Sequence, residues 1–249
     1  MPSVAGWLDQ LQPRVRAVRG GLHPLSAVKI AAGRHHDVRL RGVRVTGPDP
    51  RAVANTVVEV AAGEYGAPGF GIAAGERVVD GGANVGAFAI LAARAGAEVV
   101  AYEPHPPTFD ALERNTAGLA VHCVRAALVG EAPADGVVAF TVGATADTQG
   151  RVGGAGPSLE VPAVALADAI GEGCDLLKLD CEGAEFELLA ATSVETLRRA
   201  RRIACEVHGW AGAPELLEER LRAAGFAVAR VDKHDGLALL FALRRAADH

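Results

Sequence analysis

Short apolar runs alternate with amphipathic segments through most of the chain. Apolar residues at helical spacing over about 10 to 15 positions predict helices, and the short runs between them predict strands buried on both faces. This alternation predicts an α/β fold with a parallel sheet that helices cover on both faces. The predicted strand–helix units are 77–80 with 84–95, 98–102 with 106–117, 175–180 with 184–191, and 202–207 with 213–224; a strand at 120–125 leads into a loop.

The N-terminal part of the chain does not follow this alternation. Residues 1–34 predict one or two helices, and residues 37–45 alternate valine and leucine with arginine, as a half-exposed strand or hairpin does. A helix is predicted to start near Pro50. We therefore assign residues 1–63 to a helical and hairpin extension, and residues 64–249 to the main domain.

Two later segments predict a strand pair and a flexible loop. The runs FAVARV (226–231) and LALLFAL (237–243) flank a polar turn, so we expect a strand pair whose last strand is antiparallel to its neighbours. Residues 143–157 are rich in glycine and small polar residues, which predicts a flexible loop that orders over a bound acceptor.

Composition and charge narrow the class of protein. Half of the 249 residues are hydrophobic, yet no stretch approaches the ~20 apolar residues of a membrane span, and no secretory signal is evident. The four cysteines form no CxxC pair, so we expect reduced thiols in a cytoplasmic, non-membrane protein. The net charge of -5, without a basic block interleaved with aromatic residues, disfavours a nucleic-acid partner. Arginine, alanine and glycine are abundant, as they are in proteins of high-GC bacteria. Nothing in the sequence indicates the oligomeric state.

The segment RVVDGGANVG (77–86) carries the first candidate chemistry. A dinucleotide-binding loop needs G-x-G-x-x-G, but from Gly81 that spacing places Ala83 at the second glycine. The spacing that fits is Asp80-x-Gly82-x-Asn84-x-Gly86. An acid at the strand end suits an ammonium group, and an open helix N-terminus suits a carboxylate, so the loop fits the amino-acid end of S-adenosylmethionine. Taken alone, the glycines fit a plain tight turn equally well.

The following strand favours the first of these interpretations. The run VVAYEP ends in Glu103, 21 residues after Gly82, where a carboxylate can accept hydrogen bonds from both ribose hydroxyls. Pro104 follows, and no basic residue is present to bind a 2′-phosphate. An isolated glutamate there is commonly a solvated strand end, but the acidic loop and this spacing together favour S-adenosylmethionine.

The sequence over roughly residues 64–208 resembles the FkbM family of class I S-adenosylmethionine-dependent methyltransferases. The resemblance rests on VVDGGANVGAFAILAARAGAEVVAYEPHPPTFDALERNT, RAALVG and LLKLDCEGAEFELLA. It implies a Rossmann-like, seven-stranded, mostly parallel sheet with an antiparallel last strand, and methyl transfer to a hydroxyl of a natural product or sugar. It also places Ala126 and Ala127 near the adenine. Gly81 and Ala167 depart from the family pattern, in which an apolar residue and an aspartate are usual.

Candidate catalytic residues follow the fourth and fifth strands of this pattern. In KLDCEGAE (178–185), Asp180 or Glu182 can take the acceptor proton, orient the acceptor or bind a divalent cation. A purely structural interpretation is also open, in which Asp180 caps the next helix and Glu185 is an acid of its first turn. In CEVHGW, Glu206 and His208 share a strand face and can join Asp180 in a proton relay or metal site, although a lone strand-end histidine is commonly just exposed.

We therefore predict an S-adenosylmethionine-dependent O-methyltransferase that acts on a hydroxylated natural product or sugar-containing metabolite. The predicted catalytic residues are Asp180, Glu206 and His208. A metal-free reaction is narrowly favoured; if a divalent metal is used, its ligands would be Asp180, Glu182, Glu206 and His208. The predicted cofactor-binding residues are Tyr65, Asp80, Gly82, Ala83, Asn84, Gly86, Glu103, Pro104, Ala126, Ala127 and Asp180.

Three alternatives are weighed against this prediction. A nicotinamide-dependent oxidoreductase would share the sheet and Glu103 but needs the other glycine spacing. A non-catalytic methyltransferase-like module would lose its acidic residues, which are present here. A base-methylating enzyme would carry an Asn/Asp-Pro-Pro-aromatic motif, which the 178–185 segment lacks.

Overall fold

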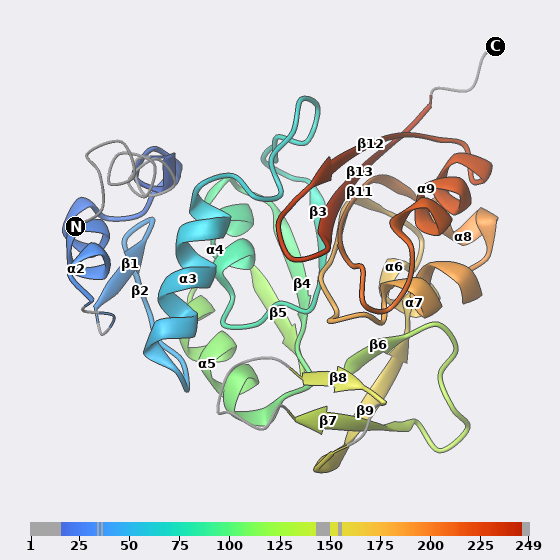
Figure 1. Cartoon of the computed structure of the whole chain (residues 1–249), viewed down its shortest axis with the longest axis horizontal. Coiled ribbons are helices and arrows are strands. Elements are labelled where there is room, and N and C mark those ends of the chain that lie inside the picture. The colour runs from blue at the N-terminus through green and yellow to red at the C-terminus, as the bar shows by residue number, and fades with distance from the viewer. Residues whose placement is uncertain (1–15, 34, 36, 143–149, 154–155, 246–249) are drawn as a thin grey trace.

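A seven-stranded sheet forms the centre of the molecule (Figure 1). The computed structural model describes residues 16–33, 35, 37–142, 150–153 and 156–245. The strand order is β12-β13-β11-β10-β3-β4-β5, and the five strands from β11 to β5 pair in parallel. Their bounds are β3 Arg77–Gly81, β4 Glu98–Tyr102, β5 Val121–Val124, β10 Cys174–Leu179 and β11 Ala200–His208. The predicted parallel sheet is therefore confirmed.

The C-terminal strand pair completes one edge of this sheet. Strand β13 (Leu237–Arg244) lies between β11 and β12 (Phe226–Asp232) and is antiparallel to both. This arrangement confirms the antiparallel last strand that the sequence predicted.

Helices cover both faces of the sheet because its central strands are apolar on both sides. Val78 and Val79 are both fully buried, but they belong to different core clusters on opposite faces. On the Val78 face lie α3 (Pro50–Ala61), α4 (Ala87–Arg94) and α5 (Pro106–Thr116). On the Val79 face lie α6 (Leu166–Ile170), α7 (Glu185–Ala191), α8 (Val194–Leu197) and α9 (Pro214–Ala223). Adjacent strand residues thus point to opposite layers.

The N-terminal extension packs against the α4 side of the sheet (Figure 1). It contains α2 (Pro24–Ala31) and the antiparallel hairpin β1 (Val38–Leu40) and β2 (Val43–Val45), which the alternating sequence predicted. Asn115 of α5 ties the extension down, because its Nδ2 donates to the carbonyl oxygens of Thr46 at 2.7 Å and Val85 at 2.8 Å. The division between residues 63 and 64 stays a prediction.

A second, four-stranded sheet was not predicted. Its order is β6-β9-β7-β8, with bounds β6 Ala127–Val129, β7 Val137–Val142, β8 Gly150–Val152 and β9 Ser158–Ala165. The prediction of a loop was wrong at 150–152, because β8 pairs with β7 despite its glycine-rich surroundings. Residues 143–149 and 154–155 lie outside the described part of the chain, so the flexible acceptor-covering loop stays a prediction.

All four cysteines lie in the described part of the chain, and all four are free thiols, as expected. Among the described helices, none combines the length and the apolar character needed to cross a membrane.

Candidate active site

The loop between β3 and α4 explains the unusual spacing of the glycines. Gly82 has a φ of 70°, and a Cβ atom there would overlap the carbonyl oxygen of Asp180. Asn84 has a φ of 51°, a left-handed conformation that asparagine tolerates better than most residues. Gly86, with a φ of 88°, caps α4, so the helix starts at Ala87 and not at residue 84 as predicted. The Asp-x-Gly-x-Asn-x-Gly pattern is therefore a sharp turn against the end of β10.

Glu103 lies at the carboxyl end of β4 and faces this loop. Its Oε2 accepts a hydrogen bond from the backbone N–H of Asn84 at 3.0 Å, and its Oε1 accepts one from His105 at 2.9 Å. The side chain is buried, and burial raises its pKa to about 7, against the opposing effect of the two backbone hydrogen bonds. A buried carboxylate at this position can accept further hydrogen bonds from a ligand.

A hollow, here called the first hollow, opens beside Glu103 between the main sheet and the four-stranded sheet. Phe140, Gly150 and Val152 of the smaller sheet line it. It also contains seven of the residues predicted to bind a cofactor: Gly82, Asn84, Glu103, Pro104, Ala126, Ala127 and Asp180. The structure therefore brings these seven residues together at one hollow, and their binding of a cofactor stays a prediction.

A second hollow lies on the other side of the loop and is lined by Tyr65, Ala83, Glu206 and His208. The two hollows have Gly82, Asn84, Asp180 and Glu182 in common. A group that passes from a ligand in one hollow to a ligand in the other would cross at these residues.

Two predicted cofactor residues line neither hollow. Asp80 is fully buried behind the loop, where its Oδ1 lies 3.1 Å from Nζ of Lys178. Gly86 faces α5, where a Cβ atom would press against Leu112 and Thr116. In the structure, therefore, Asp80 pairs with Lys178, which donates a hydrogen bond to the loop at Gly82, and Gly86 allows α4 and α5 to pack closely.

Lys178 is the cation at the centre of the site. It is 3% exposed, donates to the carbonyl oxygen of Gly82 at 2.7 Å, and lies 3.8 Å from Oδ2 of Asp180. Burial acts to lower its pKa, but the carboxylates of Asp80 and Asp180 outweigh burial and raise the pKa above its ordinary value. Lys178 therefore stays charged and links three strand-end groups.

Tyr65 joins two of the predicted catalytic residues. Its hydroxyl donates to Oδ2 of Asp180 at 2.9 Å and lies 3.3 Å from Oε2 of Glu206. The other oxygen of Glu206 accepts a hydrogen bond from Nζ of Lys233 at 2.9 Å, and Lys233 also contacts Glu64. Burial raises the pKa of Tyr65 well above its ordinary value, so it remains a neutral donor. Glu206 thus has partners on both oxygens.

His208 lies at the end of β11, buried between two glutamates. Its Nδ1 is 3.2 Å from Oε1 of Glu185, and its Nε2 is 3.4 Å from Oε2 of Glu182. Burial acts to lower its pKa, but the hydrogen bond and charge of Glu185 dominate and raise it to about 9. Burial raises the pKa of Glu182 to about 7. Asp180, Glu206 and His208 all line the second hollow, and Glu185 lies against His208. The catalytic role of the three residues stays a prediction.

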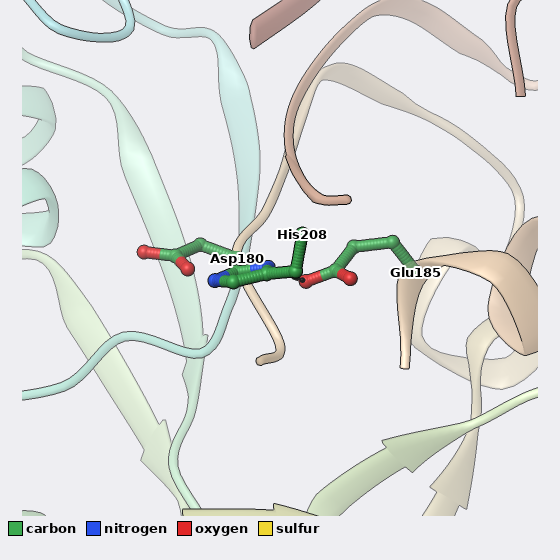
Figure 2. Close-up of side chains that lie close together, drawn as sticks. All are labelled: Asp180, Glu185 and His208. Atoms are coloured by element: carbon green, nitrogen blue, oxygen red, sulfur yellow. Dashed lines mark hydrogen bonds and ion pairs between the residues drawn. The ribbon is translucent and has the colours of Figure 1, made fainter. Parts of the chain in front are cut away.

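Three of these groups could together hold a metal ion. Asp180, Glu185 and His208 each offer one donor atom, and these atoms lie within 4.8 Å of one another (Figure 2). The set predicted from the sequence contained Glu182 and Glu206 instead of Glu185. Because the Oε1 of Glu185 already contacts Nδ1 of His208, the geometry equally describes a hydrogen-bonded pair.

Sequence reasoning missed three residues of the site: Lys178, Glu185 and Lys233. A signal was present for Lys178, because a lysine within the apolar run DLLKLD requires a buried charged partner. Nothing in the sequence marks Glu185 beyond its place in the first turn of a predicted helix.

The sheet order, the acidic turn after β3 and the carboxylate after β4 define the class I S-adenosylmethionine-dependent methyltransferase fold. A family model, the methyltransferase FkbM domain, matches residues 80–228, which is more than half of the chain. The protein therefore belongs to the FkbM methyltransferase family and is an S-adenosylmethionine-dependent methyltransferase. This membership decides against a nicotinamide-dependent oxidoreductase.

Solved structures of other methyltransferases resemble this fold at low sequence identity. The delta-N METTL16 MTase domain is 16% identical with a TM-score of 0.51, and the match covers 82% of this chain and 89% of that chain. Magnesium protoporphyrin IX methyltransferase from Synechocystis PCC 6803 with bound SAM is 16% identical with a TM-score of 0.41, covering 93% and 90%. The ribosomal protein L11 methylase from Lactobacillus delbrueckii subsp. bulgaricus is 13% identical with a TM-score of 0.43, covering 69% and 71%. Among curated proteins, no match to this chain was found.

Proposed function

We propose that this methyltransferase transfers the methyl group of S-adenosylmethionine to a hydroxyl oxygen of a small natural product or sugar-containing metabolite. The observation that supports this most directly is the meeting of the two hollows at Gly82, Asn84, Asp180 and Glu182. A donor in the first hollow and an acceptor in the second would place the methyl group beside polar groups able to act on a hydroxyl.

The first hollow suits the donor. Glu103 would accept hydrogen bonds from the ribose hydroxyls, and Ala126 and Ala127 would pack beside the adenine. The turn at Gly82 would approach the amino-acid end of the donor closely, because it carries no Cβ. The carboxylate of Asp180 would attract the positive sulfonium. Tyr65 would act on the donor through Asp180, to which it donates a hydrogen bond.

The second hollow suits a small polar acceptor more than a nucleic acid. Glu59, Glu64 and Glu206 line it together with Lys233 and His234, and Asp180 and Glu182 lie at its junction with the first hollow. Carboxylates outnumber lysines there, so a phosphate backbone would be repelled. Many donors and acceptors on the wall can bind the several hydroxyls of a sugar or a polyhydroxylated metabolite.

Methyl transfer from a sulfonium requires an aligned acceptor and a group that takes the hydroxyl proton. Oδ2 of Asp180 already binds the Tyr65 hydroxyl and lies near Lys178, which favours Asp180 as the group that orients the acceptor. His208 lines the second hollow, and its raised pKa makes it a stronger base than an ordinary imidazole. We assign proton removal to His208, and we assign to Glu206 the positioning of Tyr65 and Lys233.

The proposal is tested by binding and by product analysis. S-adenosylmethionine should bind in calorimetry, whereas NAD should not, and mass spectrometry should find one added methyl group on hydroxylated lactones or sugars. Asp180→Asn should lower turnover by about 10²-fold, because the acceptor is no longer oriented, and should also weaken donor binding, because the sulfonium loses its carboxylate. Methyl transfer only to nitrogen or carbon acceptors would contradict O-methylation, and donor binding without transfer to any acceptor would favour a non-catalytic module.

Metal dependence is tested separately. We favour metal-free transfer, because histidine is an uncommon ligand of magnesium and Nδ1 of His208 is already paired with Glu185. Activity should survive a chelator. Activity that disappears with chelator and returns with magnesium or manganese would instead make Asp180 and His208 metal ligands.

A cytoplasmic location stays a prediction from the sequence.

A further inference from the structure

Glu185 is a buried acid whose role the reaction described above does not include. It is the first residue of α7 and is 0% exposed. Its Oε1 accepts a short hydrogen bond of 2.6 Å from the backbone N–H of Cys181 and lies 3.2 Å from Nδ1 of His208. The backbone N–H therefore fixes the carboxylate in the orientation in which it meets the imidazole.

This contact determines which nitrogen of His208 carries a proton. A carboxylate can only accept hydrogen bonds, so Nδ1 must be the donor. Nε2 lies 3.4 Å from Oε2 of Glu182, which is an ion-pair contact and not a hydrogen bond, so in the neutral imidazole the lone pair is on Nε2. Figure 2 shows the imidazole between the carboxylates of Glu185 and Asp180, with Glu185 on the α7 side. The lone pair thus belongs to the nitrogen nearer the residues shared by both hollows.

We propose that Glu185 is the positioning residue of His208: it holds the Nδ1–H tautomer, aims Nε2 at the acceptor hydroxyl and stabilises the imidazolium that forms. This role rests on the proposed function. As the acceptor oxygen forms its bond to the methyl carbon, the carbon–sulfur bond breaks and its electrons return to sulfur. The hydroxyl proton passes to Nε2. The imidazolium then lies between Glu185 and Glu182, and water later removes the proton.

A purely structural role at the start of α7 explains these contacts less well. An acid in the first turn of a helix can interact favourably with the helix dipole while its side chain stays in solvent. Glu187 on the same helix is exposed and can do this, so the dipole alone does not require a buried acid. Burying Glu185 completely costs free energy unless it is paired. Its partners are the backbone N–H of Cys181 and the imidazole of His208, so the histidine supplies the side-chain partner for the burial.

The test compares Glu185→Gln with the matched control Glu187→Gln. Glutamine keeps the Oε1 acceptor that both the Cys181 N–H and Nδ1 of His208 contact, but it removes the charge that stabilises the imidazolium. We expect kcat to fall at least tenfold in Glu185→Gln, with donor affinity and acceptor KM within about threefold of wild type. Glu187→Gln should leave all three values unchanged, and Glu185→Asp should recover part of kcat because it restores the charge.

A spectroscopic measurement separates positioning from folding. With ¹⁵N-labelled histidine, NMR above pH 9 should show His208 protonated at Nδ1 in the wild type and in Glu185→Gln, whose amide oxygen still accepts from Nδ1. Glu185→Leu removes the acceptor and should give a mixture of tautomers. A wild type protonated at Nε2 would overturn the proposal, even if Glu185→Gln fails to fold. Unchanged kcat in a folded Glu185→Gln, or an unchanged tautomer in a folded Glu185→Leu, would also overturn it.

The same experiment distinguishes failure of this assignment from failure of the proposed function. If the wild type methylates only nitrogen or carbon acceptors, O-methylation fails, yet the tautomer measurement still decides whether Glu185 positions His208. Chelator sensitivity reversed by manganese would overturn the assignment, because His208 would then be a metal ligand.

Discussion

Nζ of Lys178 lies 3.1 Å from Oδ1 of Asp80, and the two residues are direct neighbours on β10 and β3. Lys178 is 3% exposed and Asp80 is fully buried. Burial raises the pKa of Asp80, and the Lys178 ammonium only partly offsets this. The pair therefore links two central strands, away from solvent, at the point where the turn between β3 and α4 begins.

Breaking this pair should destabilise the protein strongly. Lys178→Met leaves the Asp80 carboxylate buried without a cation, so the free energy of unfolding should fall by about 3–5 kcal/mol. Urea denaturation followed by circular dichroism measures the change. The double variant Lys178→Met/Asp80→Leu removes both charges and should recover most of the loss. A double variant no more stable than Lys178→Met would show that the pair is not the source of the effect.

Replacing Glu103 should weaken donor binding. Glu103→Gln removes a charged acceptor for the ribose hydroxyls, which should cost about 1–3 kcal/mol of binding free energy. Because the pKa of Glu103 is about 7, the difference from wild type should narrow as the pH falls below that value and the carboxylate takes up a proton. Calorimetry with S-adenosylmethionine at pH 8 and pH 6 measures both effects. Glu113→Gln, an exposed change on α5, is the control; equal affinities in the two variants would contradict the ribose role.

The parts of the fold with a strong periodic signal could be predicted from the sequence. The alternation of apolar strands and amphipathic helices gave the parallel sheet, and the hairpin-like C-terminus gave the antiparallel β13. The four-stranded sheet could not be predicted, because β8 is three residues long and its pairing with β7 joins segments separated by the small and polar residues 143–149. Such short strands gain their stability from partners that no local pattern identifies.

The candidate site was predictable for those residues that lie at the carboxyl ends of the parallel strands. Asp180, Glu206 and His208 follow from the rule that the carboxyl ends of parallel strands meet at one edge. The partners of these residues were not predictable. Whether His208 pairs with Glu182, Glu185 or solvent depends on the left-handed turn at Glu182, whose φ of 50° brings the start of α7 against β11. That geometry is set by tertiary packing.

Stability should fall as the pH rises from about 5.5 to 8. Glu64, Glu103 and Glu182 each have a pKa raised to about 7, with burial as the main cause, so the folded state binds more protons than the unfolded state above about pH 4.5. The raised pKa of His208, about 9, acts in the same direction, because its imidazolium contributes stability that is lost as the pH rises through that value. Urea midpoints of the ligand-free protein at pH 5.5 and pH 8 test this. A higher midpoint at pH 8 would contradict these shifts.

The pH dependence of turnover should identify the group that accepts the proton. If Nε2 of His208 is the base, only the neutral imidazole is active, and its pKa of about 9 means that most molecules are protonated at pH 7. The positive sulfonium of a bound donor lowers that pKa, so with saturating donor the rate should rise with pH and level off at or below about pH 9. His208→Gln should abolish the rising limb and lower kcat by about 10²-fold or more. A rising limb that persists in His208→Gln would show that another group takes the proton.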